Sequence, residues 1–390
     1  MRASETGSLS AASPMAIKEE NSMIYKAFQD ISLSRLGMGN MRLPVQGDKA
    51  GAPIDRVRAQ EIIDYAMENG VNYYDSAYVY HGGESEKFLG EAVKKYPRES
   101  YYLATKFLLS ANPDYKAVFE EQLARLQTDY IDFYLLHAIF DENCQSYLDS
   151  GCIEYFLEQK KAGRIRYLGF SSHAGVEALT RMADHHQWDF AQLQLNYFDW
   201  QYGTTQEEYR VLEERNIPIM VMEPVRGGRL ATLSSEAEGM LKEVHPDWSM
   251  ASWALRFVKR LPQVQVILSG MSNMEQIRDN IGTFQEPEGL SDEDTKLLMQ
   301  ACEVFRKQVS VPCTACRYCC DGCPMKIDIP VYLDVYNSYK TDGPWALNRM
   351  GGIESEGKPD DCIGCGACAG HCPQSIRIPE IMAELAELSK

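Results

Sequence analysis

The chain has 390 residues, of which 45% are hydrophobic, and its formal net charge is −17. This length is enough for one large domain and one small one. An acidic chain of this kind argues against a nucleic-acid partner, because nucleic-acid phosphates favour basic surfaces. No apolar run approaches the roughly 18 residues that a membrane-spanning helix needs, so no membrane association is expected.

Residues 1–22 are rich in Ser, Ala and Glu and show no apolar periodicity. We interpret them as a disordered leader or a cloning remnant and exclude them from the fold. They contain no apolar signal core, and the chain uses cysteine sparingly before residue 313, at Cys144, Cys152 and Cys302. These features favour a reducing, cytoplasmic location over a secreted protein with disulfides.

Short apolar runs alternate with amphipathic stretches between about residues 30 and 285. The candidate strands are 36–42, 71–76, 101–106, 130–137, 165–171, 190–196, 217–223 and 264–269. Helical patterns between them include 56–69, 85–96, 115–127, 176–186, 205–215 and 250–259. Gly70 is expected to cap the first helix at its C-terminus. Eight strand-then-helix units over about 250 residues predict an α/β fold, a (β/α)8 TIM barrel, which we assign to residues 23–290.

Polar side chains follow the strands at the end where such barrels carry their chemistry. Asp75 ends the second strand and Tyr80 follows in its loop, while Lys106 and His137 end the third and fourth strands. Together, these four residue types on adjacent strand ends suit a proton-transfer site. Taken singly, each has an ordinary explanation: a tyrosine in a tyrosine-rich stretch, a solvated strand end, or a satisfied core histidine.

The stretches around these residues resemble the aldo/keto reductase family. They read DSAYVY at 75–80, GESE at 83–86, ATK at 104–106 and TDYIDFYLLH at 128–137. Their order and spacing agree with the family, and the similarity runs from about residue 36 to residue 280. The resemblance implies that Asp75, Tyr80, Lys106 and His137 form a catalytic tetrad. It also implies NAD(P)H-linked interconversion of a carbonyl compound and its alcohol, with a small carbonyl or polyol as the substrate.

This tetrad makes physical sense for carbonyl reduction. A phenol can protonate the alkoxide left by hydride transfer only if its pKa falls from about 10 toward neutrality. An ammonium about 4 Å away contributes roughly 4 kcal/mol at an effective dielectric near 20. We therefore expect Lys106 to lower the pKa of Tyr80 and Asp75 to keep Lys106 charged. We expect His137 to donate to the carbonyl oxygen.

The resemblance also implies contacts to the nicotinamide cofactor. Ser171 and Ser172 match the polar pair for the nicotinamide amide, although the second position is more often Asn. Gln192 matches the next amide contact, and Asn280 fits a contact to the adenine. Met222 stands at the family's aromatic stacking position, so the platform for the nicotinamide ring is altered.

The chain departs from the family where the adenosine 2′-phosphate of NADPH would bind. Many members place Lys and Arg after the eighth strand, whereas this chain has Ser269, Gly270 and Gln276, with Arg278 one helical step away. Without a cation, phosphate recognition loses its strongest contribution. The sequence therefore favours NADH over NADPH.

Residues 291–312 open with Ser291-Asp292-Glu293-Asp294, typical of a capped helix, and are expected to link the barrel to a second domain at 313–390. That domain carries the pattern C-x₂-C-x₂-C-x₃-C-P twice. The cysteines are Cys313, Cys316, Cys319 and Cys323 in the first run and Cys362, Cys365, Cys368 and Cys372 in the second. Each run is followed by Ile-x-Ile-Pro, so the unit is duplicated. Residues 330–339 read as a short helix between the runs, and 342–344 as a turn.

This spacing is typical of iron–sulfur chemistry, and the region resembles a two-cluster, ferredoxin-type 4Fe–4S domain. In bacterial two-cluster ferredoxins, the fourth cysteine of each run binds the other cluster. The resemblance therefore predicts one set of Cys313, Cys316, Cys319 and Cys372 and a second set of Cys362, Cys365, Cys368 and Cys323. Zinc sites rarely repeat such a run with a proline after each fourth cysteine. Cys320 breaks the duplication and is either a packed thiol or a spare ligand.

These features predict an iron–sulfur oxidoreductase of aldo/keto reductase type. A hydride carries two electrons and a cluster normally passes one, and flavin is the usual converter, although no flavin fingerprint is evident. The clusters are expected to exchange electrons with a protein partner or a bound flavin. Two alternatives stay open: a non-catalytic barrel used for redox sensing or partner docking, and a reductase whose clusters are structural. The substrate is not identified, and Trp200, Tyr202 and Trp345 are guesses at an aromatic wall.

Overall fold

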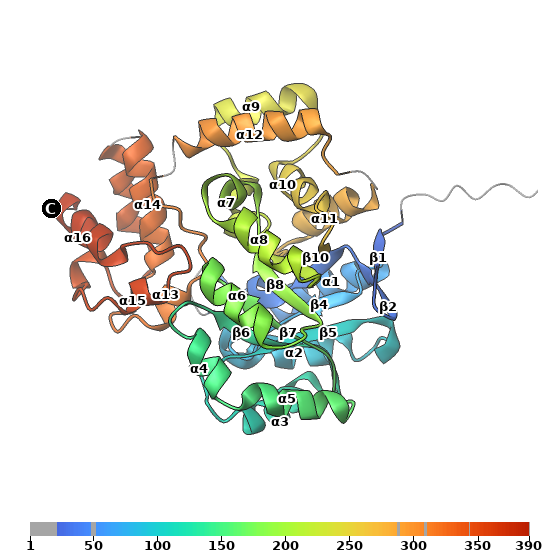
Figure 1. Ribbon diagram of the computed structural model, residues 1–390. Helices are drawn as coiled ribbons and strands as arrows, with labels where there is room; N and C mark the ends of the chain where they lie inside the picture. The colour runs from blue at the N-terminus through green and yellow to red at the C-terminus, as the bar shows by residue number, and fades with distance from the viewer. Residues whose placement is uncertain (1–21, 48–51, 287–288, 308–309, 343, 390) are drawn as a thin grey trace, which may run out of the picture.

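The computed structural model describes residues 22–47, 52–286, 289–307, 310–342 and 344–389. Apart from residue 22, the expected leader lies outside the described residues. Figure 1 shows a barrel with the N-terminal hairpin on one side and the C-terminal domain on the other. Within the described ranges, no helix is long and apolar enough to cross a membrane.

Eight parallel strands close into a barrel in the order β10-β3-β4-β5-β6-β7-β8-β9, which confirms the predicted TIM barrel. The strands are β3 (Leu36–Gly39), β4 (Tyr73–Asp75), β5 (Tyr102–Phe107), β6 (Ile131–Ile139), β7 (Ile165–Ser172), β8 (Phe190–Gln194), β9 (Ile219–Met222) and β10 (Val264–Ser269). The register places Asp75 beside Ala104 and Lys106 beside Leu135. The polar strand ends of β4, β5 and β6 therefore meet at one mouth of the barrel.

The expected helices are present, with small differences at their ends. They are α1 (Arg56–Glu68), α2 (Glu84–Val93), α3 (Tyr115–Leu126), α6 (Val176–His185), α8 (Thr205–Glu214) and α10 (Met250–Lys259). The outer layer also contains α4 (Cys144–Asp149), α5 (Cys152–Lys161), α7 (Tyr197–Tyr202), α9 (Ser235–Val244) and α11 (Met274–Gln285). Gly70 has a φ of 85°, and its N–H donates to the carbonyl of Met67. It therefore ends α1 as the sequence predicted.

A hairpin that the sequence did not predict closes the far end of the barrel. Its strands β1 (Tyr25–Phe28) and β2 (Ile31–Ser34) pair antiparallel. Phe28 and Leu33 are buried in the barrel interior, and the Phe28 ring centroid lies 5.0 Å from that of Tyr167. The hairpin thus covers apolar side chains at the end opposite the polar mouth.

The helix expected as a linker is present as α12 (Asp292–Arg306) and begins with a capping box between Ser291 and Asp294. It packs against α9 and α7. The chain then enters the cysteine-rich region, which has a second core containing Val311, Ile329, Tyr332, Leu333, Ile378 and Met382. This separate core is the mark of a second domain.

The second domain is built from short helices. They are α13 (Tyr318–Asp321), α14 (Ile329–Asp342), α15 (Ala367–Gly370) and α16 (Ile378–Leu388), with turns η5 (Pro344–Gly352) and η6 (Pro359–Asp361). The helix α14 packs against η5 and α16, and α13 packs against α15. The expected helix at 330–339 is thus part of α14, whereas Gly343 of the expected turn lies outside the described residues.

The second domain docks on the polar mouth of the barrel. Arg42 donates through Nη2 to the carbonyls of Thr314, at 3.2 Å, and Ala315, at 3.4 Å. Arg226 donates through Nη2 to Gln374 Oε1 at 3.0 Å. Arg229 and Asp334 form an ion pair across the same interface. These contacts place the first cysteine run against the ends of the barrel strands.

A close backbone contact makes the docking testable. Gly227 has a φ of 65°, and a Cβ there would lie 1.6 Å from the Thr314 carbonyl oxygen. Gly228 has a φ of 96°, and a Cβ there would meet nothing within 4 Å. Alanine at either position carries the left-handed backbone cost of roughly 1–2 kcal/mol, but only Gly227→Ala also clashes with the second domain.

We expect Gly227→Ala to loosen the docked domain and Gly228→Ala to leave it in place. The measurement is the rate at which the purified protein loses its visible iron–sulfur absorbance in air. Gly227→Ala should lose it about tenfold faster than Gly228→Ala, the equivalent of roughly 1.4 kcal/mol of docking free energy. Equal rates in the two variants would show that this contact does not hold the domain.

Candidate active site

The four predicted catalytic residues converge at the polar mouth. Asp75 ends β4, Tyr80 begins the turn η2 (Tyr80–Gly83), Lys106 lies in β5 and His137 lies in β6. Lys106 Nζ is 2.5 Å from Asp75 Oδ1 and donates to the Ser76 carbonyl at 2.6 Å. It stands 3.5 Å from the Tyr80 hydroxyl, and the Tyr80 and His137 ring centroids are 5.7 Å apart.

Burial sets the charge state of this group. Lys106 is fully buried and Asp75 is 3% exposed, so desolvation raises the pKa of Asp75 and lowers that of Lys106, while their ion pair opposes both shifts. Burial, and then the Lys106 charge, hold the pKa of His137 well below its usual value. His137 is therefore neutral near pH 7 and can donate one hydrogen bond to an oxygen.

The pKa of Tyr80 is not brought below its usual value as expected, although Lys106 lies beside the hydroxyl. Burial raises that pKa well above its usual value, and Tyr318 adds to the rise. Asp75 lies against Lys106 and neutralises much of the charge that would have acted on the phenol. Tyr80 is thus held in its protonated form, as a donor.

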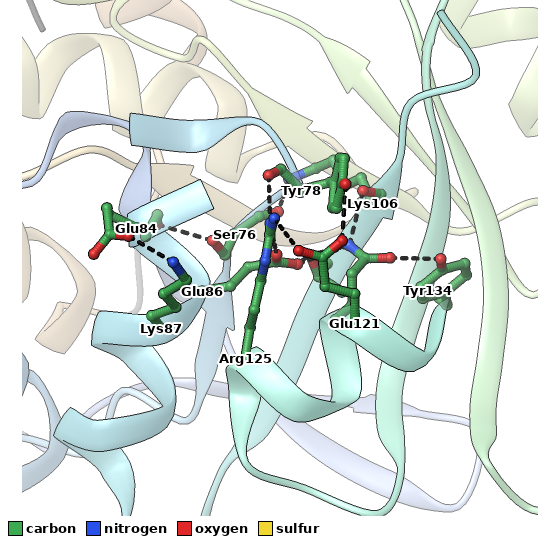
Figure 2. Close-up of polar contacts among 12 residues, drawn as sticks. Ser76, Tyr78, Glu84, Glu86, Lys87, Lys106, Glu121, Arg125 and Tyr134 are labelled. Carbon is green, nitrogen blue, oxygen red and sulfur yellow. Dashed lines mark hydrogen bonds and ion pairs between the residues drawn. The ribbon is translucent and has the colours of Figure 1, made fainter. Parts of the chain in front are cut away.

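A buried network behind the tetrad fixes Lys106 and the Tyr80 loop (Figure 2). The carboxylate of Glu86, in α2, accepts from Thr105 Oγ1 at 2.5 Å, Gln122 Nε2 at 2.7 Å and Arg125 Nη1 at 3.0 Å. Gln122 also donates to the carbonyl of Lys106 at 3.1 Å, and Arg125 donates to the carbonyl of Tyr78 at 2.9 Å.

The sequence reasoning included Glu86 in a family stretch but gave it no role. A signal was available, because Glu86 lies on the same helical face as the apolar residues Leu89, Gly90 and Val93, which are buried. A carboxylate on the buried face of a helix needs partners. Its partners lie on β5 and α3, so its function is to position the strand that carries Lys106.

A cavity of about 320 Å³ opens beside the tetrad. Six of the eight expected cofactor residues line it with Asp75 and Tyr80: Gln192, Met222, Ser269, Gly270, Gln276 and Asn280. The other two, Ser171 and Ser172, do not line it. Their hydroxyls accept the backbone N–H groups of Ala138 and Ala174 at 2.8 Å and 3.1 Å.

The lining suits a nicotinamide dinucleotide. Gln192 Oε1 is buried without a hydrogen-bond partner, and a carboxamide N–H₂ can supply one. Among the described residues that line the cavity, Arg42 is the only lysine or arginine. Its Nη2 lies 3.6 Å from Glu223 Oε1, with which it forms an ion pair. Arg278 does not line the cavity, and its guanidinium lies over the Tyr65 ring.

Two of the three residues suggested for an aromatic wall, Trp200 and Tyr202, do not line the cavity. Trp200 packs against Tyr209 and Phe257, and Tyr202 packs against Phe198. The side chain of Trp345 lies outside the described part of the chain. The second domain supplies part of the wall instead, through Cys316, Tyr318 and Pro373.

Sequence reasoning missed this contribution of the second domain. The signal lies in the duplicated unit, where the residue before the third cysteine is Tyr318 in the first run and Ala367 in the second. A bulky residue in one copy and a small one in the other marks a position that does more than bind a cluster.

The cysteines of the second domain line two small cavities. One is lined by Cys313, Cys316, Cys319 and Cys372, and the other by Cys323, Cys362, Cys365 and Cys368. Each cavity thus gathers three cysteines of one run and the fourth of the other. All twelve cysteines, which lie within the described ranges, are free of disulfides. Cys320 lines neither cavity and packs against the domain core.

The donor set suits a 4Fe–4S cluster, which takes four thiolates, one for each iron. Four cysteines line each of the two cavities. Cys316 lines both the tetrad cavity and the first cysteine cavity.

Comparisons with known proteins agree with a division of the chain into a barrel and a cysteine-rich domain. The model of the aldo/keto reductase family matches residues 35–303, and the model of the 4Fe–4S dicluster domain matches residues 312–376. The uncharacterized oxidoreductase YqkF of Bacillus subtilis is 29% identical over 69% of this chain and 92% of its own. The NADH-specific methylglyoxal reductase of Escherichia coli K12 is 24% identical over 71% and 97%.

Solved structures agree as well. The holo form of an aldo-keto reductase from Bacillus halodurans has a TM-score of 0.60 and 26% sequence identity. The match covers 72% of this chain and 96% of that one.

The buried ion pair allows a stability test. We expect Asp75→Asn to lower the free energy of unfolding by about 3–5 kcal/mol, because it leaves the Lys106 ammonium buried without an anion. Asp184→Asn is the matched control, since Asp184 pairs with Arg215 and its side chain is 58% exposed, and exposed pairs contribute at most about 1 kcal/mol. Anaerobic chemical unfolding measures both, and equal losses would contradict the structural role of the buried pair.

Proposed function

Because the chain belongs to the aldo/keto reductase family and carries a 4Fe–4S dicluster domain, we propose that it interconverts a small carbonyl compound and its alcohol with NADH. In this proposal, two 4Fe–4S clusters connect the reaction to a protein electron partner. The observation that carries the proposal is that Cys316 lines the same cavity as Asp75 and Tyr80 of the assembled tetrad.

The tetrad residues have distinct roles in this proposal. The nicotinamide cofactor, when bound, supplies or accepts the hydride. The Tyr80 hydroxyl gives a proton to the carbonyl oxygen, and the reverse reaction returns the proton to Tyr80. Neutral His137 donates a hydrogen bond to the same oxygen. Lys106, oriented by Asp75 at 2.5 Å, favours the phenolate that Tyr80 becomes.

The cavity lining supports NADH as the cofactor. Gln192 is placed to accept from the nicotinamide amide, Met222 to contact the ring, and Asn280, beside Ser269, to meet the adenine end. Arg42 is the only lysine or arginine among the described residues that line the cavity. It already forms an ion pair with Glu223 and a hydrogen bond with the Thr314 carbonyl of the second domain. An NADPH phosphate would therefore lack a free cation. A relative named as NADH-specific, which acts on methylglyoxal, supports both the cofactor and a small carbonyl substrate.

The cysteine cavities support the cross-over assignment of ligands. We assign Cys313, Cys316, Cys319 and Cys372 to the first cluster and Cys323, Cys362, Cys365 and Cys368 to the second. Cys316 adjoins the tetrad cavity, whereas Cys365 is exposed. The first cluster would therefore face the reaction and the second the partner. Two clusters that each pass one electron match the two electrons of a hydride. We assign no flavin site among the described residues.

A reducing cytoplasm, which the sparing use of cysteine predicts, would suit this assignment. Cluster ligands must be thiolates, and disulfide formation would remove them.

We expect Tyr80→Phe to reduce NADH-linked carbonyl turnover by about 10²–10⁴-fold, because the variant lacks the proton donor. Its visible and EPR signals from the clusters should stay intact, since Tyr80 contributes no cluster ligand. Tyr102→Phe is the control: Tyr102 begins β5 at the opposite end of the barrel and should keep its turnover. Near-normal turnover in Tyr80→Phe would refute the assignment of the acid.

A further inference from the structure

Tyr318 belongs to the second domain but lies beside the residues of the tetrad. It begins α13 and stands between Cys316 and Cys319 in the first cysteine run. Its ring centroid lies 6.5 Å from that of His137 and 6.1 Å from that of His173. It lines the cavity beside the tetrad, together with Tyr80 and Asp75.

Tyr318 and Tyr80 line the same cavity, and the ring centroids of both lie within 6.5 Å of that of His137. A substrate carbonyl oxygen would have to accept from the Tyr80 hydroxyl, beside His137. The Tyr318 phenol therefore occupies space next to the reacting carbonyl group.

The loop that carries Tyr318 has little freedom to retreat. Arg42 holds the carbonyls of Thr314 and Ala315, and the Thr314 carbonyl lies directly over the backbone of Gly227. Arg317 Nη2 pairs with Asp328 Oδ1 at 2.9 Å, which ties the loop to its own domain. A ligand can turn the Tyr318 ring aside more readily than it can move this backbone.

We propose that Tyr318 is a specificity-determining residue of the carbonyl site, which the iron–sulfur domain supplies to the barrel and which restricts the substrate to small aldehydes and ketones. This inference rests on the proposed function and names its substrate class. A carbonyl compound of a few carbons can take the Tyr80 hydrogen bond beside the Tyr318 ring. A compound with an aromatic ring on the carbonyl carbon competes with Tyr318 for the same space.

The kinetic test compares acetaldehyde with benzaldehyde, using NADH and the protein with its clusters intact. The variants are Tyr318→Ala, Tyr318→Leu in case the alanine variant loses its clusters, and Tyr318→Phe. We expect the alanine or leucine variant to raise the benzaldehyde-to-acetaldehyde ratio of kcat/KM at least tenfold, mainly through a lower KM for benzaldehyde. Tyr318→Phe should keep the wild-type ratio, because it keeps the ring.

Tyr339→Ala is the matched control, since Tyr339 lies in α14 of the same domain, packs against Tyr336 and does not line the tetrad cavity. It should leave the ratio unchanged. An unchanged ratio in Tyr318→Ala or Tyr318→Leu, with wild-type turnover intact, would overturn the inference and leave the proposed function standing.

A binding measurement distinguishes failure of the proposed function from failure of the inference about Tyr318. Calorimetry follows benzyl alcohol binding to the NADH-saturated protein under anaerobic conditions, where the alcohol has no hydride acceptor and no turnover occurs. The Tyr318→Ala or Tyr318→Leu variant should bind it at least tenfold more tightly than the wild type does. If the wild type reduces no carbonyl compound, the proposed function fails and the affinity alone decides: tighter binding in the variant supports the role of Tyr318, and equal affinity overturns it.

Discussion

The site depends on one buried ion pair, between Asp75 and Lys106. Two charges removed from water cost several kcal/mol each, and their attraction compensates only when the geometry is good and the remaining hydrogen-bonding groups are satisfied. The structure meets this constraint with the 2.5 Å contact and with the Ser76 carbonyl, which accepts a second hydrogen from Lys106. The tetrad can exist only where the surrounding chain enforces this geometry.

That constraint explains the network of Glu86, Gln122 and Arg125. Gln122 holds the backbone carbonyl of Lys106, and Arg125 holds the backbone of the loop that leads to Tyr80. Both side chains are tied to the Glu86 carboxylate. Helices α2 and α3 therefore fix both Lys106 and the loop that carries Tyr80. The β1–β2 hairpin closes the opposite end of the barrel.

The same mouth also joins the two domains. Arg42 contacts Glu223 in the barrel and the backbone of the first cysteine run. Cys316 and Tyr318 then bring the second domain to the wall of the cavity. The first cysteine run and Tyr80 therefore border the same cavity.

The sequence predicted the features that depend on local pattern. Apolar periodicity gave the barrel strands, and the family stretches gave the tetrad residues that now meet at β4, β5 and β6. Features set by contacts between distant segments were missed, because no local pattern encodes them. Glu86 finds its partners on another helix and strand, and Tyr318 reaches the site only once the domains dock.

The pKa of Tyr80 shows why a pairwise estimate from sequence fails. The expected ammonium is present at 3.5 Å. However, burial and the carboxylate beside that ammonium decide the outcome, and neither was quantifiable from the sequence.

The central claim is that the barrel and the clusters form one redox system. The most direct test adds NADH under anaerobic conditions to the protein with oxidised clusters and follows their visible absorbance and EPR signal. Bleaching, with the appearance of a reduced-cluster signal, is the predicted result, because Cys316 adjoins the cavity that the cofactor would enter. Clusters that dithionite reduces but NADH does not would contradict the claim and indicate a reductase whose iron–sulfur domain serves structure alone.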